Sequence, residues 1–300
     1  GDSPVVRAIF DEASTALGED LWAMVAEGPA ERLSQTVNTQ PIMLTAGVAV
    51  WRLWESLGGK PPAVVAGHSL GEYSALVAAG ALKLSDAVPL VRLRAAAMQE
   101  AVPVGTGAMA AILGLDDDGI AAACAEAAQG EVVEPVNFNA PGQTVIAGHQ
   151  GAVERACEAC KARGAKRAVL LPVSAPFHSS LLRPAADRLA IALADIAIAT
   201  PTIPVINNVD VAIETDPIRI KDALVRQAAK PVRWVEIIRA MARGIRRGDA
   251  GKPVGARECP NRQNVRRAHP DGPRSDGRIP RHARHVGLQF GNKAFVKPEP

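Results

Sequence analysis

Aromatic side chains are scarce in this chain of 300 residues, where phenylalanine, tryptophan and tyrosine together make up 3% and Tyr73 is the sole tyrosine. Proteins that bind single-stranded nucleic acid without sequence preference stack the bases on such rings. The formal net charge is only +3, which is too small an excess to indicate a polyanionic partner. We therefore expect no nucleic acid among the partners of this protein.

The chain also lacks apolar runs long enough to span a bilayer, and residues 1–4 (GDSP) contain no basic segment followed by an apolar one. Its four cysteines form no paired C-x-x-C motifs, which is typical of packing residues in a reducing compartment. Because 48% of the residues are hydrophobic, the chain can bury a full core. We expect a cytoplasmic globular protein, a monomer without membrane partner, metal site or cofactor.

The periodicity of the apolar residues divides the chain into three regions. Residues 1–104 and 174–242 alternate helical patterns with short apolar strands, which predicts an α/β core with a parallel sheet. Residues 105–173 follow the order strand, helix, strand, strand, helix, strand, which is typical of a ferredoxin-like subdomain inserted into that core. Residues 243–300 are rich in Arg, Gly and Pro and bury too little apolar area to fold, so we expect a disordered tail.

Ser69 lies in the sequence GHSLG (residues 67–71), between an apolar run at residues 63–66 and a helical pattern that begins at Glu72. Glycines on both sides of a serine allow a sharp strand-to-helix turn that exposes the hydroxyl group to a substrate carbonyl. This is the arrangement of a nucleophilic serine in acyl chemistry. The alternative is a tight turn whose serine only caps the helix that follows.

A serine nucleophile needs a base, and only one of the six histidines is well placed to serve. Three lie within residues 269–285 of the predicted tail, and His149 follows a strand of the insertion, where a turn or surface role is expected. His68 is adjacent to Ser69, so its side chain points elsewhere and shapes the site. His178 follows the insertion in a Pro- and Ser-rich loop, where a catalytic base is expected. Its alternative role is that of a helix-capping surface residue.

An acidic third member is not required for this pair. The acidic residues between Ser69 and His178 fall mostly in the inserted unit, where the acid of a hydrolase triad does not normally lie. We therefore expect a Ser–His dyad, in which a backbone carbonyl holds the second ring nitrogen of the histidine.

Arg94 lies on a predicted helix among residues that favour burial. A buried guanidinium needs an acceptor, and its planar fork matches a carboxylate group. A substrate carboxylate is one such acceptor. The alternative is an ordinary surface arginine on an amphipathic helix.

Several segments in order closely resemble bacterial malonyl-CoA:acyl-carrier-protein transacylases. They are residues 67–76 (GHSLGEYSAL), 94–99 (RAAAMQ), 137–148 (NFNAPGQTVIAG), 176–179 (PFHS) and 227–234 (QAAKPVRW). The resemblance covers residues 1–241 and implies an α/β-hydrolase-like core with an inserted ferredoxin-like subdomain. It also implies a role in fatty-acid biosynthesis, with malonyl-CoA and acyl carrier protein as partners and no cofactor.

The resemblance implies that Ser69 attacks the thioester of malonyl-CoA with His178 as base, and that the malonyl group then passes to the phosphopantetheine thiol of the carrier protein. Arg94 matches the arginine that binds the free malonyl carboxylate, and Gln227 matches the position whose main-chain carbonyl orients the histidine. The N–H of Leu70, at the start of a helix, is placed to stabilise the oxyanion. Phe177 resembles the residue that limits room for a branched acyl group.

Two departures from the family pattern leave alternatives open. The chain begins after the family's first strand and its Gly-Gln-Gly turn, whose glutamine supplies a second oxyanion donor, so we expect weaker activity. After Met241 the arginine-rich tail replaces the family's next strand, as an out-of-frame reading would produce. The alternatives are a serine thioesterase or esterase, and a weakly active truncated remnant of the transferase.

Overall fold

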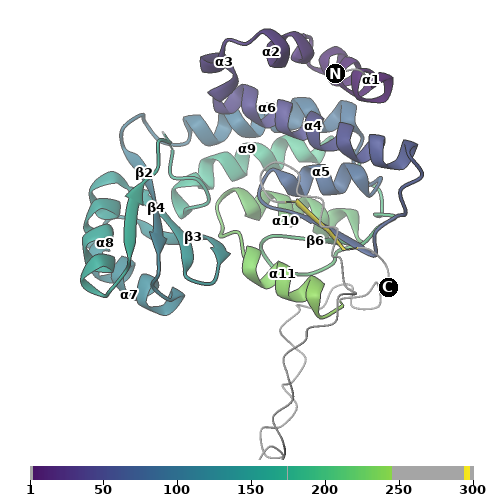
Figure 1. Cartoon of the computed structure of the whole chain (residues 1–300). Coiled ribbons are helices and arrows are strands. Elements are labelled where there is room, and N and C mark those ends of the chain that lie inside the picture. Colours follow the sequence, from purple (N-terminus) through teal and green to yellow (C-terminus); the bar gives the residue numbers. More distant parts are fainter. Residues whose placement is uncertain (1–2, 174, 245–293, 298–300) are drawn as a thin grey trace, which may run out of the picture.

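The computed structural model describes residues 3–173, 175–244 and 294–297. Figure 1 shows a larger core in which helices surround a small sheet, with a second unit of strands and two helices at its side. Residues 4–56 contain four helices: α1 (Pro4–Leu17), α2 (Leu21–Glu27), α3 (Ala30–Ser34) and α4 (Thr36–Ser56). Helix α1 ends at Gly18, which adopts a left-handed conformation, and the Asp20 carboxylate caps α2 by accepting the N–H of Ala23.

The core sheet has the strand order β6-β1-β7 among the described residues. Strand β1 (Val64–Gly67) is buried along its whole length and pairs in parallel with β6 (Val205–Ile206). On its other side it pairs antiparallel with β7 (Ala294–Lys297). The predicted parallel sheet is therefore confirmed for β1 and β6, whereas β7 makes the whole sheet mixed.

Strand β7 also differs from the disordered tail that the composition predicts for residues 243–300. Its four residues hydrogen-bond along β1, so this short segment obtains its backbone partners from the core sheet. Residues 245–293 and 298–300 lie outside the described residues.

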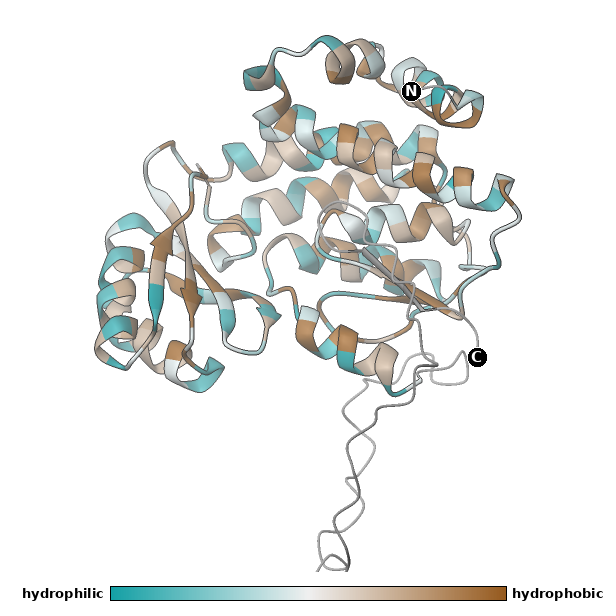
Figure 2. Cartoon of the chain, in the orientation of Figure 1, coloured by the Kyte–Doolittle hydropathy of each residue, from teal (hydrophilic) through white to brown (hydrophobic). Residues whose placement is uncertain are grey.

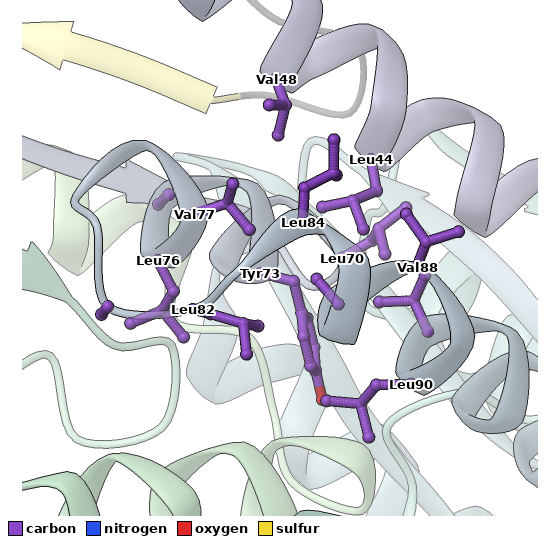
Figure 3. Close-up of a cluster of buried hydrophobic side chains, with 14 of the residues drawn as sticks. Leu44, Val48, Leu70, Tyr73, Leu76, Val77, Leu82, Leu84, Val88 and Leu90 are labelled. Carbon is purple, nitrogen blue, oxygen red and sulfur yellow. The ribbon is translucent and has the colours of Figure 1, made fainter. Parts of the chain in front are cut away.

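Two helices follow β1 and pack against the N-terminal helices: α5 (Gly71–Ala78) contacts α4, and α6 (Leu84–Glu100) contacts α1 and α4. Their apolar side chains join those of α4 in the largest buried cluster, around Tyr73. Figure 3 shows Tyr73 within this cluster, with Leu90 at the hydroxyl end of its ring. Because the residues that flank the Ser69 turn are part of the main core, the turn rests on a rigid base.

The predicted βαββαβ order is confirmed in the second unit, which has its own buried cluster. Its elements are β2 (Gly107–Leu113), α7 (Asp117–Ala128), β3 (Val133–Ala140), β4 (Gln143–His149), α8 (Gln150–Ala162) and β5 (Arg167–Leu170). The strands form an antiparallel sheet in the order β3-β4-β2-β5. Figure 2 shows that the outer sides of α7 and α8 are largely hydrophilic, as expected for helices that cover one face of a sheet.

The chain then returns to the core through one short 3₁₀ helix and three α-helices. These are η1 (Ser180–Leu182), α9 (Arg183–Ala194), α10 (Pro217–Ala228) and α11 (Trp234–Ala242). The last helix lies against β3 of the inserted unit, and the N–H of Phe138 donates to the carbonyl of Val232 at 3.0 Å. This contact joins the two units beside the Ser69 turn. None of the described helices is long and apolar enough to cross a membrane.

Gly67 gives a direct test of the turn. A Cβ atom at this position would overlap the carbonyl group of Gly71, so we expect Gly67→Ala to lower the free energy of unfolding by about 3 kcal/mol. Gly47→Ala is the matched control, because its Cβ would lie 3.4 Å from the Ser74 hydroxyl in ordinary contact and would raise helix propensity. Urea unfolding measures both. Equal stability of the Gly67→Ala and wild-type proteins would contradict this packing.

Candidate active site

Ser69 occupies the turn between β1 and α5 in a left-handed conformation, with φ of +52°. Non-glycine residues rarely adopt this conformation, and at a functional site such strain is often maintained by the surrounding structure. Among the described residues the hydrogen bonds of the Ser69 hydroxyl group involve His178 and Arg94 and no backbone N–H of α5, so Ser69 does not cap this helix. The hydroxyl group is instead directed to two side chains from other elements.

The first of these is His178, whose Nε2 lies 2.8 Å from Ser69 Oγ. Its Nδ1 lies 2.9 Å from the main-chain oxygen of Gln227. Because a carbonyl oxygen can only accept, Nδ1 carries the proton and Nε2 is free to accept the serine hydroxyl. The His178 side chain is buried, with 4% exposure, so the surface-capping alternative does not describe it.

The protonation state of His178 suits a base. Burial, together with the positive charge of Arg94, lowers its pKa from the ordinary 6.5 to about 3. The imidazole is therefore neutral at physiological pH and can take a proton from Ser69.

The second is Arg94, on α6, which is 2% exposed. Its Nη2 donates to Ser69 Oγ at 2.9 Å and to Gln227 Oε1 at 3.0 Å, while Nη1 donates to Gln40 Oε1 at 2.7 Å. All three acceptors are neutral, and among the described residues Arg94 has no ion pair within 4 Å. Glu72 interacts with Arg94 through its charge but forms no ion pair with it. A buried guanidinium whose hydrogen-bond acceptors are all neutral can bind an incoming carboxylate.

The remaining predicted site residues lie around this centre. The N–H of Leu70 donates to no acceptor within the described part of the chain, which leaves it available to a ligand. His68 Nε2 lies 2.9 Å from Asn139 Oδ1, and its ring packs edge-on against Trp234. Phe177 is half-buried and contacts one apolar cluster of the inserted unit and one of the core.

Sequence reasoning missed three polar residues of this site. Gln40, Glu72 and Asn208 are buried, and each hydrogen-bonds to one of the predicted site residues or to the Ser69 backbone. Burial raises the pKa of Glu72 to about 7, although hydrogen bonds from Gln227 and Asn208 oppose this effect. Gln40 follows the polar residues Asn38 and Thr39, so no pattern in the sequence distinguishes it. Within the described residues no His, Cys, Asp and Glu side chains form a group that could hold a metal ion.

Comparison with known proteins gives the class to which this chain belongs. Residues 1–248 match a family model described as the acyl transferase domain. Curated relatives are malonyl CoA-acyl carrier protein transacylases: that of Salmonella typhimurium is 61% identical over 239 residues, which are 80% of this chain and 77% of the relative. That of Bacillus subtilis is 46% identical over 244 residues, 81% of this chain and 77% of the relative. The chain belongs to the family of malonyl CoA-acyl carrier protein transacylases.

Solved structures give the same result. An acyl carrier protein S-malonyltransferase from Vibrio cholerae is 60% identical, with a TM-score of 0.80 over 81% of this chain and 79% of that one. A malonyl-transacylase in complex with a type II PKS acyl-carrier protein, AntF, is 56% identical, with a TM-score of 0.79 over 80% of this chain and 78% of that one. The mixed α/β fold, with one parallel strand pair and a four-stranded antiparallel sheet, is therefore that of this family.

Proposed function

We propose that this protein transfers the malonyl group of malonyl-CoA to the phosphopantetheine thiol of acyl carrier protein, through a malonyl ester of Ser69, and so supplies fatty-acid biosynthesis. The identity of 46–61% to malonyl CoA-acyl carrier protein transacylases supports the reaction. The observation that carries the residue assignment is that His178 Nε2 and Arg94 Nη2 both lie within 2.9 Å of Ser69 Oγ. A base and a carboxylate-binding group thus meet at one nucleophile.

In the first half-reaction, Ser69 Oγ attacks the thioester carbonyl while its proton passes to Nε2 of His178. The N–H of Leu70 stabilises the oxyanion that forms, and the imidazolium is stabilised by the Gln227 carbonyl that accepts its Nδ1–H. The C–S bond then breaks, and the coenzyme A sulfur takes the proton from His178. In the second half-reaction the carrier thiol gives its proton to His178 and its sulfur attacks the ester carbonyl. The C–O bond then breaks, and Ser69 Oγ takes the proton back from His178.

Arg94 provides selectivity for a diacid. The malonyl carboxylate replaces neutral acceptors of the guanidinium with a charged one, which strengthens the hydrogen bonds. An acyl group without a carboxylate leaves Arg94 with its neutral hydrogen-bond acceptors and obtains no favourable binding interaction with the guanidinium. This favours the transferase over a serine thioesterase or esterase, since hydrolysis of neutral esters does not need a buried cation beside the nucleophile. Phe177 restricts branching at the acyl α-carbon, and His68 shapes the site beside the inserted unit through its hydrogen bond with Asn139.

We infer that the described parts of residues 1–104 and 174–242 form an α/β-hydrolase-like acyltransferase core, and that residues 105–173 form a ferredoxin-like subdomain. The strand order β3-β4-β2-β5, with neighbours antiparallel, supports the second assignment. A cytoplasmic location and a monomeric state stay predictions.

The low pKa of His178 predicts the pH dependence of acylation. The imidazole gains its proton only near pH 3. When the pH is lowered from about 8 to about 5, we therefore expect no fall in the rate of Ser69 malonylation at about pH 6.5, where an ordinary histidine would gain its proton. Rapid-quench mass measurement across this range gives the profile. The glutamine in the Glu72→Gln variant does not titrate. A change in rate near pH 7 that is present in the wild type and absent from this variant is therefore assigned to Glu72, whose pKa is about 7. A fall centred on pH 6.5 that persists in Glu72→Gln contradicts the neutral base.

The proposed reaction is tested with malonyl-CoA and the phosphopantetheinylated carrier protein. We expect malonyl-carrier protein to accumulate with little free malonate, as followed by mass spectrometry. Rapid release of malonate without carrier loading would instead identify a thioesterase. A folded chain that neither loads the carrier nor releases malonate would identify an inactive remnant.

A further inference from the structure

The side chain of Asn208 spans the strained turn from one side to the other. Its Oδ1 accepts the N–H of Ser69 at 2.6 Å, and its Nδ2 donates to the carbonyl of Gly67 at 2.7 Å. The residue lies just after β6, the parallel neighbour of β1, and is fully buried. One carboxamide therefore connects the end of β1 with the peptide group of the nucleophile.

Asn208 is itself held by a buried carboxylate. Its main-chain N–H donates to Glu72 Oε2 at 2.9 Å, and the same oxygen accepts Gln227 Nε2 at 2.8 Å. Gln227 Nε2 also lies 3.0 Å from the main-chain oxygen of Ser69. Both polar groups of the Ser69 backbone thus have side-chain partners that Glu72 keeps in place.

These contacts bear on the conformation of the nucleophile. A left-handed serine costs free energy unless its surroundings fix it, and a buried N–H without an acceptor adds to that cost. The Asn208 carboxamide supplies the acceptor and closes the turn across residues 67–69. It also occupies the N–H of Ser69, so that the N–H of Leu70 is the neighbouring donor left available to a ligand.

We propose that Asn208 is a positioning residue, which holds the Ser69 peptide so that Oγ stays between His178 and Arg94. This inference rests on the proposed function, because it takes Ser69 as the nucleophile. It assigns Asn208 no contact with substrate. Its effect is on the rate at which Ser69 reacts, and it leaves the binding of the acyl carboxylate by Arg94 unchanged.

The test measures the reactivity of Ser69 in two ways on the full chain. A fluorophosphonate probe phosphonylates an activated serine, forming the O–P bond as fluoride leaves and the base takes the proton. Malonyl-CoA measures acylation itself. Because a misplacement of about 1 Å can cost about 10²-fold in rate, we expect Asn208→Ala to slow both reactions about 10²-fold. The KM for malonyl-CoA should stay within about twofold of the wild-type value.

Two further variants separate positioning from stability. Asn207→Ala is the matched control, since Asn207 is also a buried asparagine, but its Oδ1 accepts the N–H of Asp210 rather than a group of the turn. We expect it to lower the melting temperature while Ser69 keeps its reactivity. Asn208→Asp keeps the shape and the acceptor but places a carboxyl oxygen against the Gly67 carbonyl instead of the Nδ2 donor, and we expect it also to slow both reactions. It decides the question if Asn208→Ala does not fold.

Two results would overturn the inference: wild-type reactivity of Ser69 in the folded Asn208 variants, or an equal loss in Asn207→Ala. The two probes also separate the proposals. If the wild-type protein reacts with the fluorophosphonate but not with malonyl-CoA, the proposed function fails while the Asn208 comparison still stands on the phosphonate rates. A wild-type Ser69 inert to both probes removes the nucleophile and the inference with it.

Discussion

The His178→Ala protein is expected to malonylate Ser69 about 10⁴-fold more slowly than the wild type. The variant loses the group 2.8 Å from Ser69 Oγ that takes the proton during attack. Arg94 cannot replace it, because the guanidinium is a donor to the same oxygen and stays protonated. Rapid-quench mass spectrometry with malonyl-CoA measures the rate.

His149→Ala is the control for loss of an imidazole elsewhere. The His149 ring accepts the N–H of Val132 within the inserted unit and is not among the groups that hydrogen-bond to Ser69. We expect this variant to acylate at the wild-type rate, with some loss of stability. Acylation by His178→Ala within about tenfold of the wild type would show that another group serves as base.

The Arg94→Ala protein is expected to lose about 10³-fold in kcat/KM for malonyl-CoA, because removal of one partner of a buried charge pair typically costs several kcal/mol. For acetyl-CoA, which has no carboxylate, the rate should stay level or rise. The ratio of the two kcat/KM values therefore falls by about the same factor. Steady-state assays with both thioesters measure it.

Arg92→Ala provides the matched control on the same helix. Arg92 pairs with Glu19 at 3.0 Å, away from the site, and we expect its loss to leave the malonyl-to-acetyl ratio unchanged. An unchanged ratio in Arg94→Ala would contradict the role of Arg94 and reopen the thioesterase alternative.

Local patterns in the sequence were sufficient to predict most helices and strands and the turn at Ser69. The alternation of apolar residues fixes the βαββαβ order of the inserted unit, because periodicity is a property of neighbouring residues. Strand order does not depend on neighbouring residues alone, so the pairing of β7 with β1 could not be predicted from residues 294–297. Its composition gives no sign that it would obtain hydrogen bonds from a strand more than two hundred residues away.

The site divides in the same way. Ser69, Arg94 and His178 could be predicted because each residue type is unusual in its local sequence. Arg94, for example, is a cation among apolar neighbours. Asn208 could not be predicted in this way, because its role depends on a hydrogen bond to Ser69, a residue 139 positions away. Glu72 and Gln40 likewise acquire their roles from partners on other elements. A buried amide or carboxylate becomes recognisable only when the fold shows what it touches.

The most direct test of the whole account is to incubate the protein with malonyl-CoA and to map the modified peptide by mass spectrometry. The account predicts one malonyl group in ester linkage on Ser69 in the wild-type protein, and no adduct in Ser69→Ala. A folded wild-type protein that stays unmodified, or one that carries the malonyl group on a different residue, would contradict it.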